Sequence, residues 1–315
     1  KATAGIHFIK VLKALGLDQE LAGRLRPFPN GATAMRELPV RFDLAGGWTD
    51  TPPYCLERPA RVVNLALSLE GRLPVGAEVH ALAERSFELV IEGGPTRTIR
   101  AAEELARIGL ADTHVLLATA LMVCGFGDGS GITQGCRVRT WSRVPRGSGL
   151  GGSSILAAAL VSALQRLAGR PDDPRTVSDL VLVLEQRMTT GGGWQDQVGA
   201  LWPITVPNAA RLELEQRLVL VFTGQERLAK NVLQMVVRGY LRRDGRVLAA
   251  LRGLVGLAAD AQHALSLGNL DALGGILREV WHAHQQLDPH CSNPAVDAMF
   301  RAVEDLAVGG KLSGA

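Results

Sequence analysis

The chain has 315 residues, of which 47% are hydrophobic and 21% charged, and its 34 basic and 31 acidic residues give a net charge of +3. This length predicts two domains. The composition excludes an intrinsically disordered chain, which could not bury enough apolar surface to offset its ordering entropy. The basic residues are scattered, whereas nucleic-acid binding favours a concentrated stripe, and the longest apolar stretch, residues 115–126, is too short to cross a bilayer. We therefore expect a soluble enzyme that binds neither nucleic acid nor membranes.

The cysteines and the chain ends indicate where such a protein works. The four cysteines show no Cys-x-x-Cys spacing, which indicates free thiols in a reducing compartment. No basic segment followed by an apolar one opens the chain, so no secretion signal is predicted. The chain starts at Lys1 rather than Met and stops within a glycine-containing turn. We expect a cytoplasmic protein and a fragment of a longer polypeptide.

Strands and helices alternate in the first two thirds of the chain. Apolar residues at helical spacing predict a helix within residues 1–25, which Pro27 and Pro29 end. Alternating apolar residues predict short strands at residues 40–44, 62–67, 77–82 and 137–141. Helical periodicity predicts helices at residues 101–109, 114–123, 154–167 and 178–187.

Beyond Pro207 the predicted structure is mainly helical. A continuous apolar segment at residues 218–222 predicts one strand. Helical patterns follow at residues 229–240, 247–267, 270–286 and 294–306. We place a domain boundary within residues 203–208, which divides the chain into a helical connector (1–35), a first domain (36–205) and a second domain (206–315).

Glycine is concentrated in four segments, residues 46–47, 147–152, 191–193 and 309–314. Clustered glycines let the backbone turn tightly or lie close to a ligand. Ordinary turns explain any single cluster equally well, but four clusters favour loops that converge on one site.

The strongest local motif is Val144-Pro-Arg-Gly-Ser-Gly-Leu-Gly-Gly-Ser-Ser154, between a predicted strand and a predicted helix. Successive backbone N–H groups and the helix N-terminus can bind an anion there, which favours phosphate binding over a simple capped helix. Gly147-x-Gly149-x-x-Gly152 also fits the dinucleotide pattern, but a loop at residues 169–174 replaces the acidic strand end that this pattern needs. No lysine precedes Ser153 in the glycine run, so the P-loop pattern fails as well.

Three motifs give the chain its resemblance to a known family. Pro145-x-x-x-Gly149-Leu-Gly-Gly-Ser-Ser154 resembles the nucleotide-binding motif of the GHMP kinase superfamily, with Gly152 where the family's first serine usually falls. Arg41 to Asp50 resembles its sugar-recognition motif, and residues 190–197 resemble its catalytic-aspartate segment. The turn that begins at Lys311 resembles a truncated third motif. Residues 45–54 and 189–197 together are most similar to L-fucokinases.

This resemblance implies an α+β fold, the GHMP kinase fold. Its N-terminal, ATP-binding domain is ribosomal-S5-domain-2-like, and its C-terminal domain is ferredoxin-like and helical. The resemblance further implies that ATP is held by Pro145, Gly147, Ser148, Gly149, Leu150, Gly151, Gly152, Ser153 and Ser154. Mg²⁺ would be held by Glu185 with Ser153 or Ser154; the alternative for Glu185 is a solvated or ion-paired helix residue.

For the substrate side, we predict that Asp196 is the general base, because three glycines before it let a carboxylate approach the sugar hydroxyl. The resemblance places Arg41 near the transferred phosphoryl group, with a structural ion pair as the alternative. Asp50 would bind sugar hydroxyls. Trp48 and Trp194 would stack on the sugar or, equally well, pack in the core. Gly192, Gly193 and Thr223 would line the sugar side.

The resemblance implies an ATP- and Mg²⁺-dependent sugar 1-kinase that converts L-fucose to L-fucose 1-phosphate, with a fused or partner pyrophosphorylase domain outside this chain. A kinase for another sugar, such as D-glycero-D-manno-heptose 7-phosphate or galactose, is the nearest alternative. A sensor on the same fold would lack catalysis, but Asp196 and Glu185 are both present. A nicotinamide-dependent enzyme is disfavoured.

Overall fold

A computed structural model describes residues 33–126, 135–189, 191–202, 206–224 and 229–313. The chain divides into two compact units that interleave along the sequence. The first unit comprises residues 1–36, 77–140 and 160–172, and the second comprises residues 37–76, 141–159 and 173–315. The division into residues 1–35, 36–205 and 206–315 stays a prediction, and the helix predicted within residues 1–25 lies outside the described residues.

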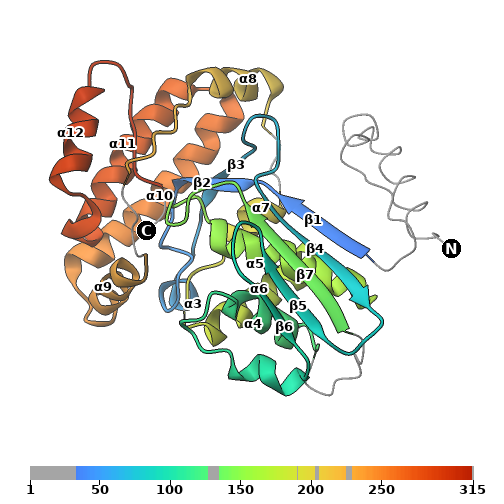
Figure 1. Cartoon of the computed structure of the whole chain (residues 1–315). Coiled ribbons are helices and arrows are strands. Elements are labelled where there is room, and N and C mark those ends of the chain that lie inside the picture. The colour runs from blue at the N-terminus through green and yellow to red at the C-terminus, as the bar shows by residue number, and fades with distance from the viewer. Residues whose placement is uncertain (1–32, 127–134, 190, 203–205, 225–228, 314–315) are drawn as a thin grey trace. The chain divides into compact units, whose positions relative to one another are not determined.

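The first unit is built on a five-stranded sheet (Figure 1). Its strand order is β1 (Thr33–Leu38), β4 (Val75–Leu82), β7 (Gly135–Ser142), β5 (Phe87–Ile91) and β6 (Thr96–Ile99). Strand β5 pairs parallel with β7 and antiparallel with β6, so that Phe87 lies opposite both Cys136 and Ile99. All three side chains are buried. The unit also contains the 3-10 helix η1 (Ala102–Arg107), helix α4 (Val115–Val123) and the second part of helix α5 (Gly152–Leu167).

The second unit combines a two-stranded sheet with most of the helices. Strand β2 (Val40–Ala45) pairs antiparallel with β3 (Val63–Leu67), and every residue of β2 is buried. Against these strands pack the long helices α10 (Gly245–Leu267) and α11 (Leu270–Leu287), which share an apolar core that includes Leu254, Val280 and Trp281. The other helices are α3 (Tyr54–Glu57), α6 (Pro174–Arg187), α7 (Gln195–Leu201), α8 (Asn208–Arg217), α9 (Ala229–Leu241), η2 (Pro289–Cys291) and α12 (Pro294–Ala302).

Most of the predicted elements in the described residues are confirmed. The strands predicted at residues 40–44, 62–67, 77–82 and 137–141 correspond to β2, β3, β4 and β7. The strand predicted at residues 218–222 is wrong. This segment is irregular and exposed, with Val219 at 77% and Phe222 at 55% exposure, and it pairs with no described strand. An apolar run becomes a strand only when a neighbouring strand accepts its backbone hydrogen bonds.

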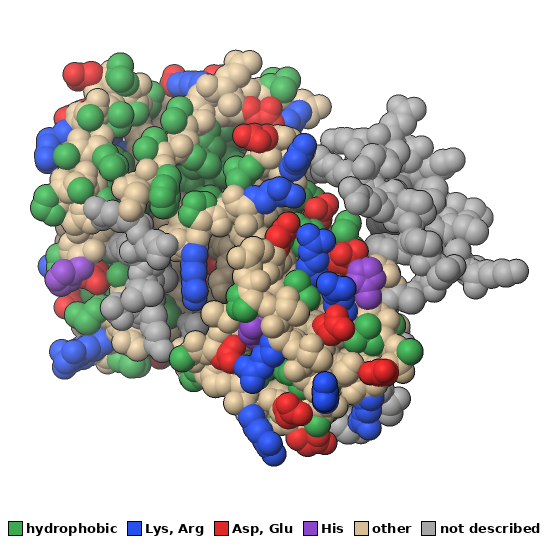
Figure 2. All heavy atoms as spheres, in the orientation of Figure 1, with side chains coloured by type: hydrophobic (Ala, Val, Ile, Leu, Met, Phe, Trp, Pro, Cys, Tyr) green, Lys and Arg blue, Asp and Glu red, His purple; other side chains and the backbone are tan. Residues whose placement is uncertain are grey.

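Sequence periodicity did not predict several short elements, β1, β5, β6, α3, α7 and α8. The helix predicted at residues 101–109 is instead the 3-10 helix η1, and the helix predicted to end at residue 306 ends at Ala302. The four cysteines are free thiols. No helix in the described part of the chain is long and apolar enough to cross a membrane. On the face seen in Figure 2, basic side chains are interspersed with acidic ones.

Candidate active site

Strand β2 supplies the central cation of the candidate site. Side chains two positions apart lie on the same face of a strand, so Arg41 and Asp43 share one face of β2. The Arg41 guanidinium donates from Nε to Asp196 Oδ1 at 2.7 Å, and Nη2 donates to the same oxygen. Its Nη1 donates to the carbonyl oxygen of Gly149 at 2.6 Å. Arg41 therefore links the predicted base directly to the predicted phosphate loop.

The glycine loop approaches this ion pair closely because it lacks side chains. Gly147, Gly149 and Gly151 all have φ between +72° and +74°, a conformation that favours glycine. A Cβ atom on Gly151 would lie 3.1 Å from Asp196 Cγ and 3.2 Å from Arg41 Nε. Helix α5 begins directly after the loop at Gly152, so the loop leads into a helix N-terminus. This arrangement suits an anion, because N–H groups and the helix dipole point the same way.

Ser154 and Glu185 form the second polar pair. The Ser154 hydroxyl, in the first turn of α5, donates to Glu185 Oε1 on helix α6. Burial raises the pKa of Glu185 to about 7; the Ser154 hydrogen bond opposes this rise, while the charges of Asp196 and Asp50 add to it. Of the two serines that the sequence left open, the structure brings Ser154 to Glu185, whereas Ser153 is exposed.

This pair fits a magnesium ion by its chemistry. Mg²⁺ binds oxygen ligands, and it is usually held by one or two carboxylates together with substrate phosphates and waters. The Ser154 hydroxyl and the Glu185 carboxylate supply such oxygens beside the glycine loop. Within the described ranges, no group of three His, Cys, Asp or Glu residues could hold a metal by itself. The donor set thus matches an ion that takes its remaining ligands from water and a nucleotide.

The first residue of α7 holds the buried Asp50 side chain. This side chain is fully buried, and Oδ2 accepts a hydrogen bond from the Gln195 backbone N–H at 2.9 Å. Its Oδ1 has no hydrogen-bond partner among the described residues. Burial raises the pKa of Asp50 to about 7, opposed by the Gln195 hydrogen bond. A buried oxygen without a partner is unusual and points to a polar ligand.

A second ion pair from β2 was not predicted from the sequence. The Lys311 ammonium donates to the backbone oxygen of Asp43 at 2.8 Å and to its carboxylate, and the two side chains are 0% and 2% exposed. Burial alone would raise the pKa of Asp43, but the charges of Lys311, His284 and Arg41 and the Lys311 hydrogen bond together outweigh burial and hold that pKa below its usual value. Two residues later, the Ser313 hydroxyl donates to Gly149 at 2.9 Å. A signal was present, because Lys311 lies in the C-terminal glycine cluster.

Three of the four glycine clusters border this polar centre, and the fourth segment reaches it through Lys311 and Ser313 rather than through its described glycines. Gly151 lies against Asp196, and a Cβ on Gly193 would lie 1.9 Å from Asp50 Oδ2. A Cβ on Gly47 would lie 2.5 Å from Asp43 Oδ2, the oxygen that accepts from Lys311. Because each glycine borders a charged group, the loops enclose one polar centre.

The other residues that were predicted to contact the sugar differ in how deeply they are buried. Trp48 is 5% exposed and packs in the hydrophobic core, which favours the core-packing alternative over stacking on a sugar. Trp194 is half-buried at the start of α7, and Gly192 would place a Cβ 3.8 Å from Glu185 Oε2. Thr223 is half-buried in the irregular segment after α8.

A cavity of about 570 Å³ adjoins the two predicted sugar loops. It is lined by Pro52, two residues after Asp50, and by Gly191, one residue before Gly192. Its volume lies within the range that small-molecule sites usually have. Sequence motifs did not indicate the α9 side chains of this cavity, which are Leu233, Gln234, Val237, Arg238 and Leu241.

Comparison with known proteins identifies relatives of this chain. The family model described as GHMP kinases N terminal domain matches residues 100–203. The bifunctional fucokinase/GDP-fucose pyrophosphorylase of Arabidopsis thaliana is 41% identical over an alignment of 300 positions, which covers 89% of this chain and 28% of that protein. The L-fucokinase/L-fucose-1-P guanylyltransferase of Bacteroides fragilis is 31% identical over 88% of this chain and 33% of its own length. The chain thus spans a third or less of these two relatives.

One relative of similar size and several solved structures extend the comparison. The D-glycero-alpha-D-manno-heptose 7-phosphate kinase of Campylobacter jejuni is 27% identical over 90% of this chain and 86% of its own length. The solved structure of the Methanococcus jannaschii mevalonate kinase matches with a TM-score of 0.66 at 13% identity, covering 91% of this chain and 89% of that one. The Lactococcus lactis galactokinase matches with a TM-score of 0.62 at 15% identity, covering 96% and 88%. These structures share the predicted α+β fold.

Proposed function

Since the chain belongs to the GHMP kinase superfamily, we propose that it is the kinase part of an ATP-dependent sugar 1-kinase, and that its substrate is L-fucose. The reaction would transfer the γ-phosphoryl group of ATP directly to the anomeric hydroxyl and yield L-fucose 1-phosphate and ADP. The observation that carries the proposal is the Arg41 guanidinium, which contacts both Asp196 and the Gly149 carbonyl. This contact supports the proposal because phosphoryl transfer needs a proton acceptor beside an anion-binding loop, the roles that we propose for Asp196 and the glycine loop.

Each group then has a defined task. Asp196 orients the sugar hydroxyl and accepts its proton, since its carboxylate keeps 21% exposure while Oδ1 is held by Arg41. Arg41 fixes that carboxylate and adds positive charge near the transferred group. The backbone of the glycine loop binds the ATP phosphates.

Ser154 and Glu185 would hold Mg²⁺, which when bound neutralises charge on the phosphates. Both side chains reach this position from rigid helices, because Ser154 lies in the first turn of α5 and Glu185 in α6. Asp50, Trp194, Gly192, Gly193 and Thr223 would border the sugar.

L-fucose is favoured over other sugars by the named activities of the two relatives at 41% and 31% identity. Both relatives also carry a second activity, a pyrophosphorylase or guanylyltransferase, by name. We extend the proposal to the whole protein, in which a fused or partner domain would consume L-fucose 1-phosphate. Four free thiols suit the reducing, ATP-containing cytoplasm.

A heptose phosphate is the second candidate substrate. It is favoured by one observation, the similarity to the Campylobacter jejuni kinase, which extends over 86% of that protein. The two candidates differ chemically, because a heptose 7-phosphate carries a dianion that needs its own cationic partner. Arg238 and Arg242, which line the 570 Å³ cavity, could supply one.

The test is sugar-dependent ADP release with Mg-ATP across L-fucose, D-arabinose, D-galactose, D-mannose and D-glycero-D-manno-heptose 7-phosphate. ³¹P NMR of the product then locates the phosphate. We expect the highest kcat/KM with L-fucose and a phosphate at C1. Turnover only with another sugar would overturn the proposal that L-fucose is the substrate. Saturable L-fucose binding without turnover of any sugar would overturn the proposal that the protein is a kinase.

A further inference from the structure

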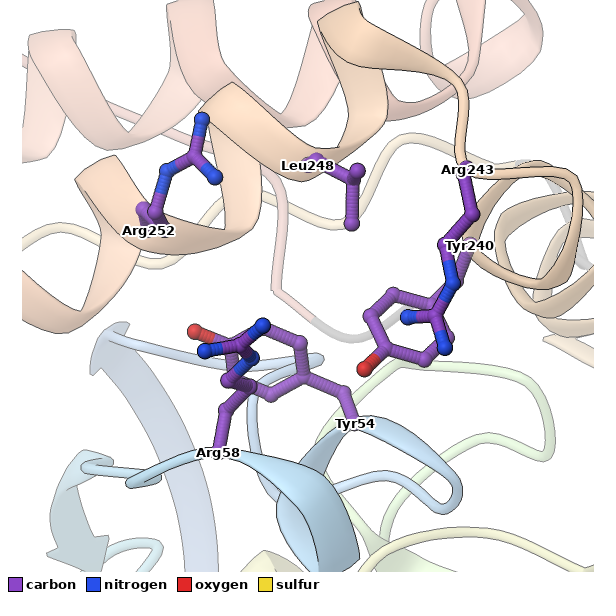
Figure 3. Close-up of a pocket in the computed structure, with 6 residues that line it drawn as sticks. All are labelled: Tyr54, Arg58, Tyr240, Arg243, Leu248 and Arg252. Carbon is purple, nitrogen blue, oxygen red and sulfur yellow. The ribbon is translucent and has the colours of Figure 1, made fainter.

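A second cavity, of about 240 Å³, has a chemistry that the proposed reaction does not use (Figure 3). Tyr54 and Arg58 line it from helix α3 and the residue that ends this helix. Tyr240 of α9, Arg243 after it, and Leu248 and Arg252 of α10 complete the lining. All of these residues belong to the second unit, and none of them holds a role in the candidate active site.

The cavity carries an excess of positive charge. Three guanidinium groups line it, those of Arg58, Arg243 and Arg252. The carboxylate that contacts the lining is Glu57, which accepts from the Tyr240 hydroxyl at 2.7 Å and from Arg243 at 3.0 Å. Neither Arg58 nor Arg252 forms an ion pair with a carboxylate of the described residues. Three positive charges and one negative charge leave about two uncompensated charges, which matches a dianion.

The walls of the cavity are already ordered. Tyr54 and Tyr240 are 5% and 2% exposed, and their rings meet edge to face with centroids 5.6 Å apart. The Arg243 guanidinium lies over the Tyr240 ring at 5.1 Å. The Tyr54 hydroxyl has no hydrogen-bond partner within the described part of the chain and is free to donate. Because the two tyrosine rings are already packed, they lose little conformational entropy when a ligand binds.

The volume of the cavity and the chemistry of its hydrogen-bond donors restrict which ligands it can bind. A volume of about 240 Å³ lies below the usual range for drug-sized ligands, roughly 300–1,000 Å³. Guanidinium groups donate in a planar fork that fits the oxygens of phosphate groups. All three arginines are exposed, so a charged ligand can reach them from water.

We propose that this arginine–tyrosine cavity binds a phosphate dianion, either inorganic phosphate or the phosphoryl group of a sugar phosphate. Arg58, Arg252 and the Tyr54 hydroxyl supply the free donors, and Arg243 adds charge from the opposite wall. Because binding needs no turnover, this site can be present or absent independently of the kinase reaction.

The test is isothermal titration calorimetry of the full chain with inorganic phosphate and, separately, with α-D-galactose 1-phosphate. Arg252→Gln and Arg58→Gln should each weaken phosphate binding about tenfold or more, because each removes a charge-assisted contact. Tyr54→Phe keeps the ring and should weaken binding about threefold to tenfold. The matched control is Arg246→Gln, on the same helix α10 but outside the cavity, which should bind as the wild type does.

The results of these titrations distinguish inorganic phosphate from a sugar phosphate as the ligand and test the proposal. Equal binding of both probes, lost in the two arginine variants, supports recognition of the phosphate group alone. Binding of the sugar phosphate only, with the same losses, supports a phosphorylated sugar. Phosphate held by the glycine loop would survive the Arg58 and Arg252 substitutions. Unchanged binding in both arginine variants, or no binding of either probe to the wild type, would overturn the proposal.

Discussion

Two ion pairs leave the same face of strand β2, and they differ in their access to solvent. Arg41 binds Asp196, whose carboxylate is 21% exposed, whereas Asp43 binds Lys311, and both of those side chains are at most 2% exposed. The first pair can therefore meet a substrate and the second cannot. We therefore propose a chemical role for the Arg41–Asp196 pair and a structural role for the Asp43–Lys311 pair.

The two pairs also differ in what they join. Arg41 links β2 to the glycine loop and to the start of α7, which are segments that would bind ATP and sugar. Lys311 links β2 to the C-terminal segment, from which Ser313 reaches the same carbonyl of Gly149. We infer that the buried Asp43–Lys311 pair helps to hold the glycine loop in position, while the carboxylate of the Arg41–Asp196 pair stays accessible to a substrate.

The largest expected effect is on folding stability. Lys311→Met should lower the free energy of unfolding by about 3–5 kcal/mol, because it leaves the Asp43 charge buried without a partner. Urea unfolding followed by circular dichroism measures this change. Arg211→Gln, in the exposed pair Arg211–Glu215, is the control and should cost less than about 1 kcal/mol. Equal effects of the two substitutions would contradict the structural role of Lys311.

The two buried aspartates should respond to pH in opposite ways. The pKa of Asp50 is raised to about 7, so its contribution to stability is complete below about pH 4 and is lost as the pH rises through 7. The pKa of Asp43 is lowered, so its contribution is lost only in more acidic solution. The ligand-free protein should lose up to about 4 kcal/mol through Asp50 between pH 4 and 7.

Asp50→Asn should flatten this dependence, although Glu185, whose pKa is also raised to about 7, keeps part of the slope. The measurement is urea unfolding at several pH values for both proteins. An identical slope in the wild type and in Asp50→Asn would show that Asp50 does not titrate in this window.

A pair of neighbouring glycines tests the close packing around Asp50. Gly193→Ala would place its Cβ 1.9 Å from Asp50 Oδ2, and relief of this clash should cost about 1–3 kcal/mol and raise KM for the sugar. Gly192→Ala is the matched control, because its Cβ meets Glu185 Oε2 only at an ordinary 3.8 Å. Thermal unfolding and sugar titrations should separate the two variants, and similar behaviour of both would contradict this geometry.

The smallest effect concerns the two adjacent serines. Ser154→Ala should raise the Mg²⁺ concentration for half-maximal ADP release about tenfold, because it removes the hydroxyl that contacts Glu185. Ser153→Ala, which changes an exposed hydroxyl one position earlier, should change it little. A larger effect at Ser153 would move the metal site to that residue.

Much of this centre could be predicted because its loops are encoded locally. Glycines fix the loops, alternation fixes β2, and Arg41, Asp50 and Asp196 lie inside recognisable motifs. The partner of Asp43 could not be predicted in this way, since Lys311 lies 268 residues further along the chain. Contacts over such separations depend on the packing of α10 and α11 against β2, which periodicity does not reveal.

The arginine–tyrosine cavity was missed for a related reason. Arg58 and Arg252 belong to no sequence motif. They line one cavity only because α3, α9 and α10 come together in the folded chain. The segment 218–222 shows the converse, because its apolar run predicted a strand that has no partner. In both cases, tertiary packing decided what local sequence could not.

The most direct test of the central claim compares sugar-dependent ADP release and urea unfolding of the wild type with those of Asp196→Asn. Asparagine keeps the size of the side chain but cannot accept the proton. We predict that kcat falls about 10²- to 10⁴-fold with L-fucose. The free energy of unfolding should fall by less than the about 3–5 kcal/mol expected for Lys311→Met, because the asparagine oxygen can still accept a hydrogen bond from the buried Arg41 guanidinium. Full activity in Asp196→Asn would contradict the proposed catalytic role of the Arg41–Asp196 pair. A loss of activity that is explained by unfolding of the variant would contradict it as well.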